Sequence, residues 1–361
     1  MNRFFDPQLE TKPDFVECMK RIYAWYDHQV LDRVPVRFAA HNAEYDVVDN
    51  LDRWPTLKDR WYDTEYQVNK FIDGLKTGSF LGETFPMYWP NVGPNAFAGM
   101  LGCELEFGDV TSWAQPCIEE ADEIDKIVFN ENSEYLLKLN EMTDYALERC
   151  QGKFMVGYTD MHPGLDCVGA LLGTQNMFYQ MVEDQDAIIE LVRKCAGPFF
   201  KLMDEFHAKL KAHNQLSVTW MNIPSYETVH IPSCDHGAMI SPKMFNEIEL
   251  PFVVEEAQHF THNIFHVDGK EVANHLDALL AIPEIQAYQW VQGLGLGKPI
   301  MQWVPLIQRI QAAGKSAVVD LHLSELEDFM AAVRPEGILL CIDESDPEVQ
   351  KEVLKRLLKW K

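Results

Sequence analysis

Short apolar runs alternate with longer amphipathic runs through the C-terminal third of the chain. In chain order these runs are 264–268, 270–282, 285–290, 303–314, 316–321, 324–333, 337–343 and 345–360. The first run of each pair is apolar at nearly every position, which is typical of a strand buried on both faces. The second run repeats its apolar residues with helical spacing. The pattern therefore predicts four strand–helix units built on a parallel sheet.

The earlier part of the chain continues this pattern less regularly. It predicts a helix over 15–30, strands over 34–41, 153–161 and 217–220, one long helix or a broken pair over 184–213, and a helix over 241–260 that breaks at Pro251. A closed eight-fold barrel and an open doubly wound sheet both fit. No G-x-G-x-x-G turn follows an early strand, which weakens the nucleotide-binding form of the open sheet. A closed (β/α)8 TIM-type barrel and an open sheet of another kind therefore remain the alternatives, and we interpret the glycine-rich run 293–297 as a loop at the rim of the site.

The segment 44–120 differs from its surroundings in its density of tryptophan, proline and glycine. Its aromatic residues need burial, so it is not a linker. We expect an N-terminal aromatic-rich insertion that covers the barrel mouth, where Glu83 and Tyr88 reach the pocket. Because the composition does not change abruptly along the chain, we interpret residues 1–361 as a single domain.

The net charge of −25 narrows the set of partners. An acidic surface repels nucleic-acid backbones and anionic membrane surfaces, so neither is an expected partner. No run of about 18 apolar residues predicts a transmembrane helix. The eight cysteines include no C-x-x-C pair. In a chain of this length, they indicate reduced thiols in a cytoplasmic protein.

Polar and aromatic side chains occur where nearly every predicted strand ends. They are Tyr158, Asp160, His162, Trp220, His266, Asp268, Gln289, Trp290, Asp320, His322, Cys341, Asp343 and Glu344. In a (β/α)8 barrel the carboxyl ends of the strands surround the active site. Loops are polar in any protein, but the recurrence of these side chains predicts a site at the barrel mouth.

His266 and Asp268 are two residues apart on one predicted strand, so their side chains face the same side. The pair could act as metal ligands or as an acid and a base, or it could be a hydrogen-bonded couple that fixes a loop. Cys341 adds a thiol, and imidazole, carboxylate and thiolate all bind zinc. An isolated cysteine is nevertheless more often a core thiol than a ligand.

Asp160 and His162 are candidates for moving a proton, and hydrogen bonds that hold a loop explain such residues equally well. The same two interpretations apply to Asp166, Asp235 and His236, and Asp235 is also suited to hold its own loop in place. Aromatic rings provide flat walls for a ligand. The residues expected to shape the pocket are Tyr158, Trp220, Gln289 and Trp290.

Four stretches of the chain resemble the uroporphyrinogen decarboxylase superfamily. They are LDRVPV at 31–36, FGDVTSW at 107–113, CDHGAMISPKMF at 234–245 and FHVDGKEVANHLDALLAIPEIQAYQW at 265–290. Within that superfamily, the chain is most similar to the uroporphyrinogen-decarboxylase-like proteins related to cobamide-dependent methyltransferases. The resemblance implies a distorted (β/α)8 barrel with its cleft at the C-terminal mouth, in agreement with the pattern of strands and helices.

The resemblance also implies which chemistry the residues support. The decarboxylases hold their substrate's carboxylates with an arginine-rich motif after the first strand, and only Arg37 remains here, at a shifted place. The methyltransferases carry a zinc motif of His-x-Cys and a later cysteine. His266 matches the histidine, Cys341 falls near the later cysteine, and Asp268 replaces the middle cysteine. The resemblance therefore implies zinc bound by His266, Asp268 and Cys341. Because Asp268 replaces a cysteine, this set of ligands is harder than that of the methyltransferases.

The first functional hypothesis is methyl transfer between a small methylated substrate and a corrinoid, with Asp160 or His162 moving the proton. A partner protein would carry the corrinoid, because the chain lacks the cobalamin motif D-x-H-x-x-G. One alternative is a metal-free decarboxylase in which Asp160 stabilises charge on a smaller acid. Another is a non-catalytic protein that binds a corrinoid or tetrapyrrole. The resemblance further suggests a homodimer.

Overall fold

The computed structural model describes residues 5–41, 51–292 and 299–361. The predicted rim loop at 293–297 and the first residues of the 44–120 segment lie outside the described residues. The largest sheet has six parallel strands in the order β1–β10–β9–β8–β7–β6. They are β1 (Val36–Phe38), β6 (Val229–His230), β7 (His262–Asp268), β8 (Ala287–Val291), β9 (Ser316–Leu321) and β10 (Ile338–Ile342). The four strands predicted for the C-terminal third are confirmed, and each lies beside the next.

The six-stranded sheet forms one curved wall of strands. A second pair of parallel strands, β2 (Met87–Tyr88) and β5 (Met155–Val156), continues this wall. The backbone N–H of Glu83 donates to the carbonyl oxygen of Val36 at 2.7 Å, which joins the chain before β2 to β1. The 44–120 segment is therefore not purely an insertion, because it contributes β2 to the wall. The strands together form a curled parallel α/β sheet, consistent with a distorted barrel.

The wall is irregular between β5 and β6. The backbone N–H of Tyr158 donates to the carbonyl oxygen of Val218 at 3.0 Å, so the chain near 218 lies beside the end of β5. The predicted strand at 217–220 is not regular, and its pairing there is an isolated antiparallel bridge between Ser217 and Ser225. The strand next to β7 is instead β6, ten residues further along the chain.

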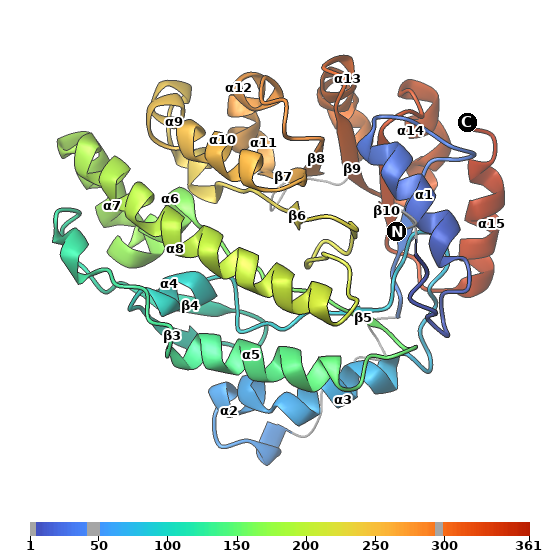
Figure 1. The fold of residues 1–361 in the computed structure, drawn as a ribbon. Helices are drawn as coiled ribbons and strands as arrows, with labels where there is room; N and C mark the ends of the chain where they lie inside the picture. The colour runs from blue at the N-terminus through green and yellow to red at the C-terminus, as the bar shows by residue number, and fades with distance from the viewer. Residues whose placement is uncertain (1–4, 42–50, 293–298) are drawn as a thin grey trace.

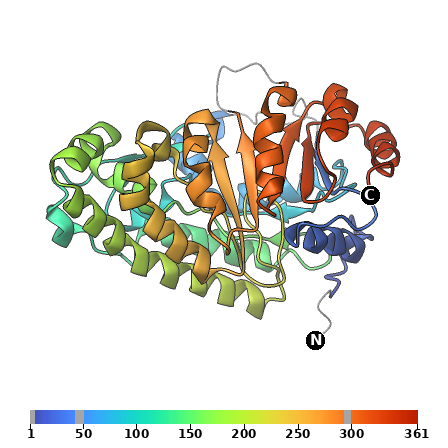
Figure 2. The ribbon, with the colours of Figure 1, turned by 90° about the horizontal axis from the view of Figure 1, so that it is seen from above.

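Helices surround the strands, as Figure 1 shows, and the later strands lie side by side in Figure 2. The helices are α1 (Phe15–Tyr26), α2 (Leu57–Tyr62), α3 (Thr64–Gly74), α4 (Ala96–Met100), α5 (Glu134–Leu147), α6 (Gly164–Leu172), α7 (Thr174–Glu183), α8 (Gln185–Ala212), α9 (Pro242–Ile248), α10 (Leu250–His259), α11 (Gly269–Val272), α12 (Leu276–Leu280), α13 (Val304–Ala312), α14 (Leu326–Ala332) and α15 (Pro347–Leu357). The predicted break near Pro251 is confirmed between α9 and α10, and α8 runs without a break through Pro198. Within the described residues, no helix combines the length and the apolar character needed to cross a membrane.

The strands bury both of their faces, as their apolar sequences predict. On one face, Ile264, Ala287 and Val318 pack with the buried side of α1. On the other face, Phe265 and Tyr288 belong to a larger cluster formed with the surrounding helices. Side chains alternate along a strand. The side chains of His266 and Gln289, two positions after Ile264 and Ala287, therefore lie on the same side of the sheet, the side against which α1 packs.

Helix α1 closes the amino end of the sheet. Its apolar residues recur with helical spacing, and one side of it is buried against the strands. The Trp25 indole N–H donates to the carbonyl oxygen of Gly337 at 3.0 Å, and the Ser316 hydroxyl donates to the carbonyl oxygen of Trp25 at 2.6 Å. These bonds tie α1 to the chain where β9 and β10 begin, so the opposite, carboxyl end of the sheet is left to form a site.

A buried ion pair also lies at the amino end of β1. The Glu83 carboxylate accepts from the Arg33 guanidinium at 2.8 and 2.9 Å, from Arg21 at 3.3 Å, and from the backbone N–H of Val36 at 2.8 Å. The Glu83 side chain is 0% exposed. Glu83 therefore does not reach a pocket at the carboxyl end, contrary to expectation, because it neutralises buried arginine.

We predict that Arg33→Ala lowers the free energy of unfolding by about 3–5 kcal/mol, because it leaves the Glu83 carboxylate buried without its closest cation. Urea denaturation at neutral pH measures the change. Arg356→Ala is the matched control, since Arg356 pairs with Glu327 at the surface, where a pair contributes about 1 kcal/mol or less. Equal losses in the two variants would contradict this account of Glu83.

Candidate metal centre

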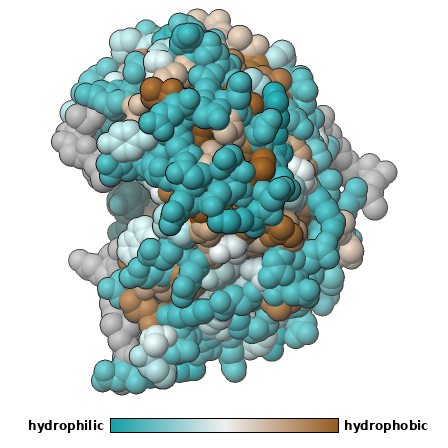
Figure 3. Space-filling model, turned by 90° about the vertical axis from the view of Figure 1, so that its left-hand side faces the viewer, coloured by the Kyte–Doolittle hydropathy of each residue, from teal (hydrophilic) through white to brown (hydrophobic). Residues whose placement is uncertain are grey.

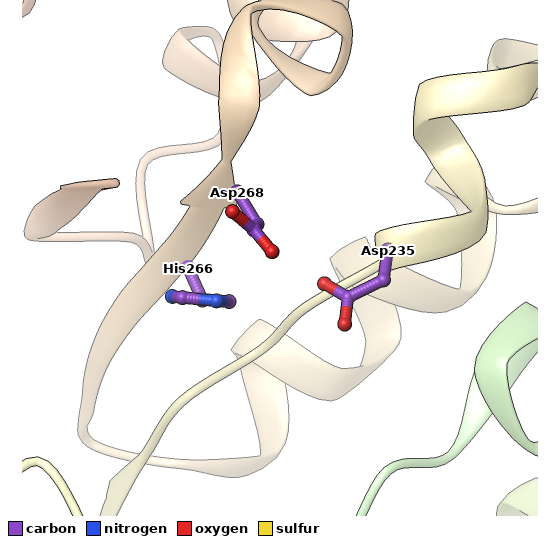
Figure 4. A group of neighbouring side chains, drawn as sticks. All are labelled: Asp235, His266 and Asp268. Carbon is purple, nitrogen blue, oxygen red and sulfur yellow. The ribbon is translucent and has the colours of Figure 1, made fainter. Parts of the chain in front are cut away.

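Three side chains that can bind a metal converge at the carboxyl end of the sheet. One ligand atom from each of Asp235, His266 and Asp268 lies within 4.8 Å of the others. Figure 4 shows the three side chains pointing toward a common space, His266 and Asp268 from β7 and Asp235 from the neighbouring loop. The spacing of His266 and Asp268 on one strand places both on one side, as the sequence predicts. The group is half-buried to exposed, so solutes can reach it.

Gln289 and Trp220 hold the imidazole of His266. Strand register places His266 beside Gln289 of β8, and Nδ1 of His266 lies 2.7 Å from Oε1 of Gln289. A carbonyl oxygen only accepts hydrogen bonds, so Nδ1 is the donor in this contact, which leaves Nε2 as the ring atom that can bind a metal. The ring of Trp220 meets that of His266 edge to face, with centroids 5.6 Å apart. Two of the residues predicted to shape the pocket therefore contact the predicted catalytic histidine.

The carboxylate of Asp166 holds the turn that carries Asp235. It accepts from the backbone N–H groups of Asp235 and His236 at 3.0 and 3.1 Å, and from Nδ1 of His236 at 2.7 Å. Burial alone would raise the pKa of Asp166, but the bond to His236 and the charge of that ring lower it. Asp166, which lies on α6, therefore fixes the loop that carries Asp235. The sequence allowed this loop-holding role for both Asp166 and Asp235.

Asp235 is held in an acidic environment. Asp235 is exposed at its surface, but the protein around its carboxylate displaces water; this desolvation and the charge of Asp166 raise its pKa above the usual value, and His266 and His162 oppose that shift. Asp268 also raises the pKa of Asp235, because like charges so close repel each other. A cation placed among these groups would relieve the repulsion.

His162 forms a second pair beside this group. Its Nε2 lies 2.8 Å from the Asp160 carboxylate, and its Nδ1 lies 3.0 Å from the hydroxyl of Ser233. Burial would lower the pKa of His162, but Asp160, with smaller contributions from Asp166 and Asp235, raises it to about 10. The ring is therefore an imidazolium at neutral pH. Ser233 in turn pairs with the backbone of His266, which places the two clusters side by side.

Cys341 lies apart from this group of ligand atoms. Strand β10 places it between Arg37 of β1 and Asp320 of β9, on the side of the sheet that faces α1. Burial raises the pKa of its thiol to about 11, and the charge of Arg37 opposes the shift. The structure therefore brings the predicted ligands His266 and Asp268 together with Asp235, and it places Cys341 as a neutral thiol beside Arg37.

Three of the residues predicted to shape the pocket lie elsewhere. Trp290 follows Gln289 on β8, so its side chain lies on the opposite face of the sheet. There its ring centroid is 4.7 Å from that of Trp303, in the apolar cluster between the sheet and the surrounding helices. Tyr158 packs edge to face against His207 of α8. Tyr88 packs against Phe71 of α3. Strand alternation explains the placements of Trp290 and Tyr88, which lie in β8 and β2, whereas Tyr158 lies two residues beyond the end of β5.

Asp235 is the functional candidate that the sequence alone did not single out as a ligand. The sequence predicted the strand before β7 at 217–220, whereas β6 lies at 229–230 and its continuation pairs Ser233 with His266. A strand end at Ser233 would have placed Asp235 on the same edge as Asp268. The signal was present as an acidic residue after an apolar run, but the strand was assigned to the wrong run.

Comparisons with known proteins support the fold. No protein-family model matches the sequence, and no curated protein matches it significantly. The structure is similar to a methyltransferase from Methanosarcina mazei, with a TM-score of 0.58 and 11% sequence identity over 95% of this chain and 98% of that one. At this identity the similarity establishes the fold alone.

We predict that His162 makes stability depend on pH. Its pKa rises from 6.5 in the unfolded chain to about 10 in the folded one, so its protonation stabilises the fold fully below pH 6.5. That contribution is lost as the pH rises toward 10. Asp160→Asn removes the carboxylate that raises the pKa, so this variant should lose less stability than the native protein across that range.

Urea denaturation at a series of pH values measures both slopes. Asp204→Asn is the control, because it removes the partner of the surface residue His259 and leaves His162 unchanged. The same slope in native protein and Asp160→Asn would show that the Asp160–His162 pair does not control this dependence.

Proposed function

We propose that this protein is an enzyme that transfers a methyl group between a small methylated compound and a corrinoid, with a divalent metal ion bound by Asp235, His266 and Asp268. The observation that carries the proposal is the convergence of these three ligands at the carboxyl end of a parallel sheet. The working residues of barrel enzymes lie at that end. The similarity in fold to a methyltransferase supports the choice of reaction.

The residues fit a divalent ion. One imidazole nitrogen and two carboxylate oxygens are a ligand set that zinc accepts, and three protein ligands leave a position open. Asp268 occupies the N-cap position of α11, yet its side chain does not cap that helix, so its oxygens are available. The repulsion between Asp235 and Asp268 also favours a cation. With two carboxylates and no thiolate, the site is harder than one built on cysteine.

A bound divalent ion would act as a Lewis acid on the heteroatom that gives up or receives the methyl group. Gln289 would keep the His266 lone pair directed at the site, and Trp220 would form an apolar wall beside it. The His162 imidazolium, oriented by Asp160 and Ser233, would donate the proton that the heteroatom requires when the methyl group leaves it. A separate protein would present the corrinoid.

We predict that the native protein retains about one divalent ion per chain after dialysis, and that His266→Ala retains less than about a tenth of it, because two carboxylates alone bind poorly. Elemental analysis measures the content. His259→Ala is the matched control, since His259 is an exposed histidine that pairs with Asp204. Gln289→Ala should weaken the affinity by about 10- to 100-fold, as expected for a partner that orients a ligand. A native protein that holds no ion would remove the metal from the proposal.

We predict that the metal-loaded protein demethylates free methylcobalamin in the presence of a simple alkane thiol, and that His266→Ala does so at least about 100-fold more slowly, because the heteroatom is no longer polarised. The absorbance change of the cobalamin measures the rate, and His259→Ala should match the native protein. Release of carbon dioxide from small acids by metal-free protein would favour the decarboxylase alternative. Cobalamin binding without turnover would favour a carrier.

A further inference from the structure

Four cysteines outside the candidate metal centre gather around a β-hairpin. The hairpin consists of β3 (Glu104–Phe107) and β4 (Ser112–Gln115), and its last pair at the open end is Glu104 with Gln115. Cys103 precedes β3, and Cys117 follows β4 by two residues. Behind them, Cys167 of α6 and Cys195 of α8 form a second, fully buried pair.

We propose that Cys103 and Cys117 form a reversible disulfide that closes the base of this hairpin. Their sulfur atoms lie 3.5 Å apart, close enough for the Cys103 S–H to donate to the Cys117 sulfur. A disulfide bond is about 2.05 Å long, so the sulfurs must approach by about 1.5 Å. Both residues lie just outside the paired residues of the hairpin, and all eight cysteines are free in this structure.

The two thiols differ in a way that suits stepwise oxidation. Cys117 is half-buried, so an oxidant can reach it, whereas Cys103 is buried. The Cys103 S–H donates to the Cys117 sulfur, which lowers the pKa of Cys117 and raises that of Cys103. Cys117 is therefore the attacking thiolate and Cys103 the resolving thiol, since the thiolate is the nucleophile in such reactions.

Hydrogen peroxide is a sufficient oxidant. The Cys117 thiolate attacks one peroxide oxygen, the O–O bond breaks, and the products are a sulfenic acid on Cys117 and hydroxide. The sulfur of Cys103 then attacks the sulfur of Cys117, the S–O bond breaks, and the departing hydroxide takes the Cys103 proton to leave as water. Two thiols and one peroxide thus give one disulfide and two waters. An external dithiol reverses the reaction by exchange.

A thiolate metal site is the weaker explanation of the same cluster. Within the described chain, the group of three ligand atoms that lie within 4.8 Å of one another is the Asp235 group, and the cysteines do not form such a group. The cluster therefore consists of two pairs, and only Cys117 among the four is accessible enough to begin a reaction.

Peroxide treatment of the reduced full chain, followed by alkylation, digestion and mass spectrometry, tests the proposal. We expect the eight free thiols to fall by two, with a peptide in which Cys103 and Cys117 are linked, and dithiothreitol to restore both. Oxidation should also raise the melting temperature by roughly several degrees, because the link constrains the unfolded chain.

Three variants separate the steps. Cys117→Ser should retain all of its remaining thiols, Cys103→Ser should stop at a sulfenic acid on Cys117, and neither should show the rise in melting temperature. Cys150→Ser is the control, because that thiol bonds to the carbonyl oxygen of Leu147 away from the cluster, and it should form the link as the native protein does. An unchanged thiol count, a link between Cys167 and Cys195, sulfinic acid on Cys117 with Cys103 still free, or protection by a metal bound to the cysteines would each overturn the proposal.

Discussion

The candidate site depends on the alternation of side chains along the strands of a curled parallel sheet. On the side that faces α1, Ile264 and Ala287 are apolar, and His266 and Gln289 follow them two residues later. Because α1 covers the amino end of the sheet, these polar groups stand at the opposite end. The same alternation turns Trp290 toward the helices. One geometric rule therefore places both the chemistry and the core.

The electrostatics of the site follow from a local excess of carboxylates. Two of the acids are balanced by imidazoles, since Asp160 pairs with His162 and Asp166 pairs with His236. Asp235 lies beside these pairs and has a raised pKa. Several carboxylates thus gather at a point where a cation or a protonated group is favoured. Figure 3 shows a hollow in one face of the molecule, between its upper and lower halves.

Most of the C-terminal strands and helices could be predicted, because apolar runs and helical spacing are local properties of the sequence. The N-terminal half was harder, because the parallel strands β1, β2 and β5 are only two or three residues long and carry little pattern. β2 lies within the aromatic-rich segment and was not predicted as a strand. The run 217–220 was predicted as a strand in place of β6. The error at β6 removed Asp235 from the set of predicted ligands.

The sequence by itself determined the parallel α/β class, the polar strand ends and the shared side of His266 and Asp268, because a period of two along a strand needs no knowledge of its neighbours. The tertiary structure decided which other side chain joins them. The chain after β6 pairs with β7 and brings Asp235 to His266, whereas β10 pairs with β9 and β1 and so places Cys341 beside Arg37. Strand order is a long-range property, and it depends on how the whole sheet closes rather than on any local run of residues.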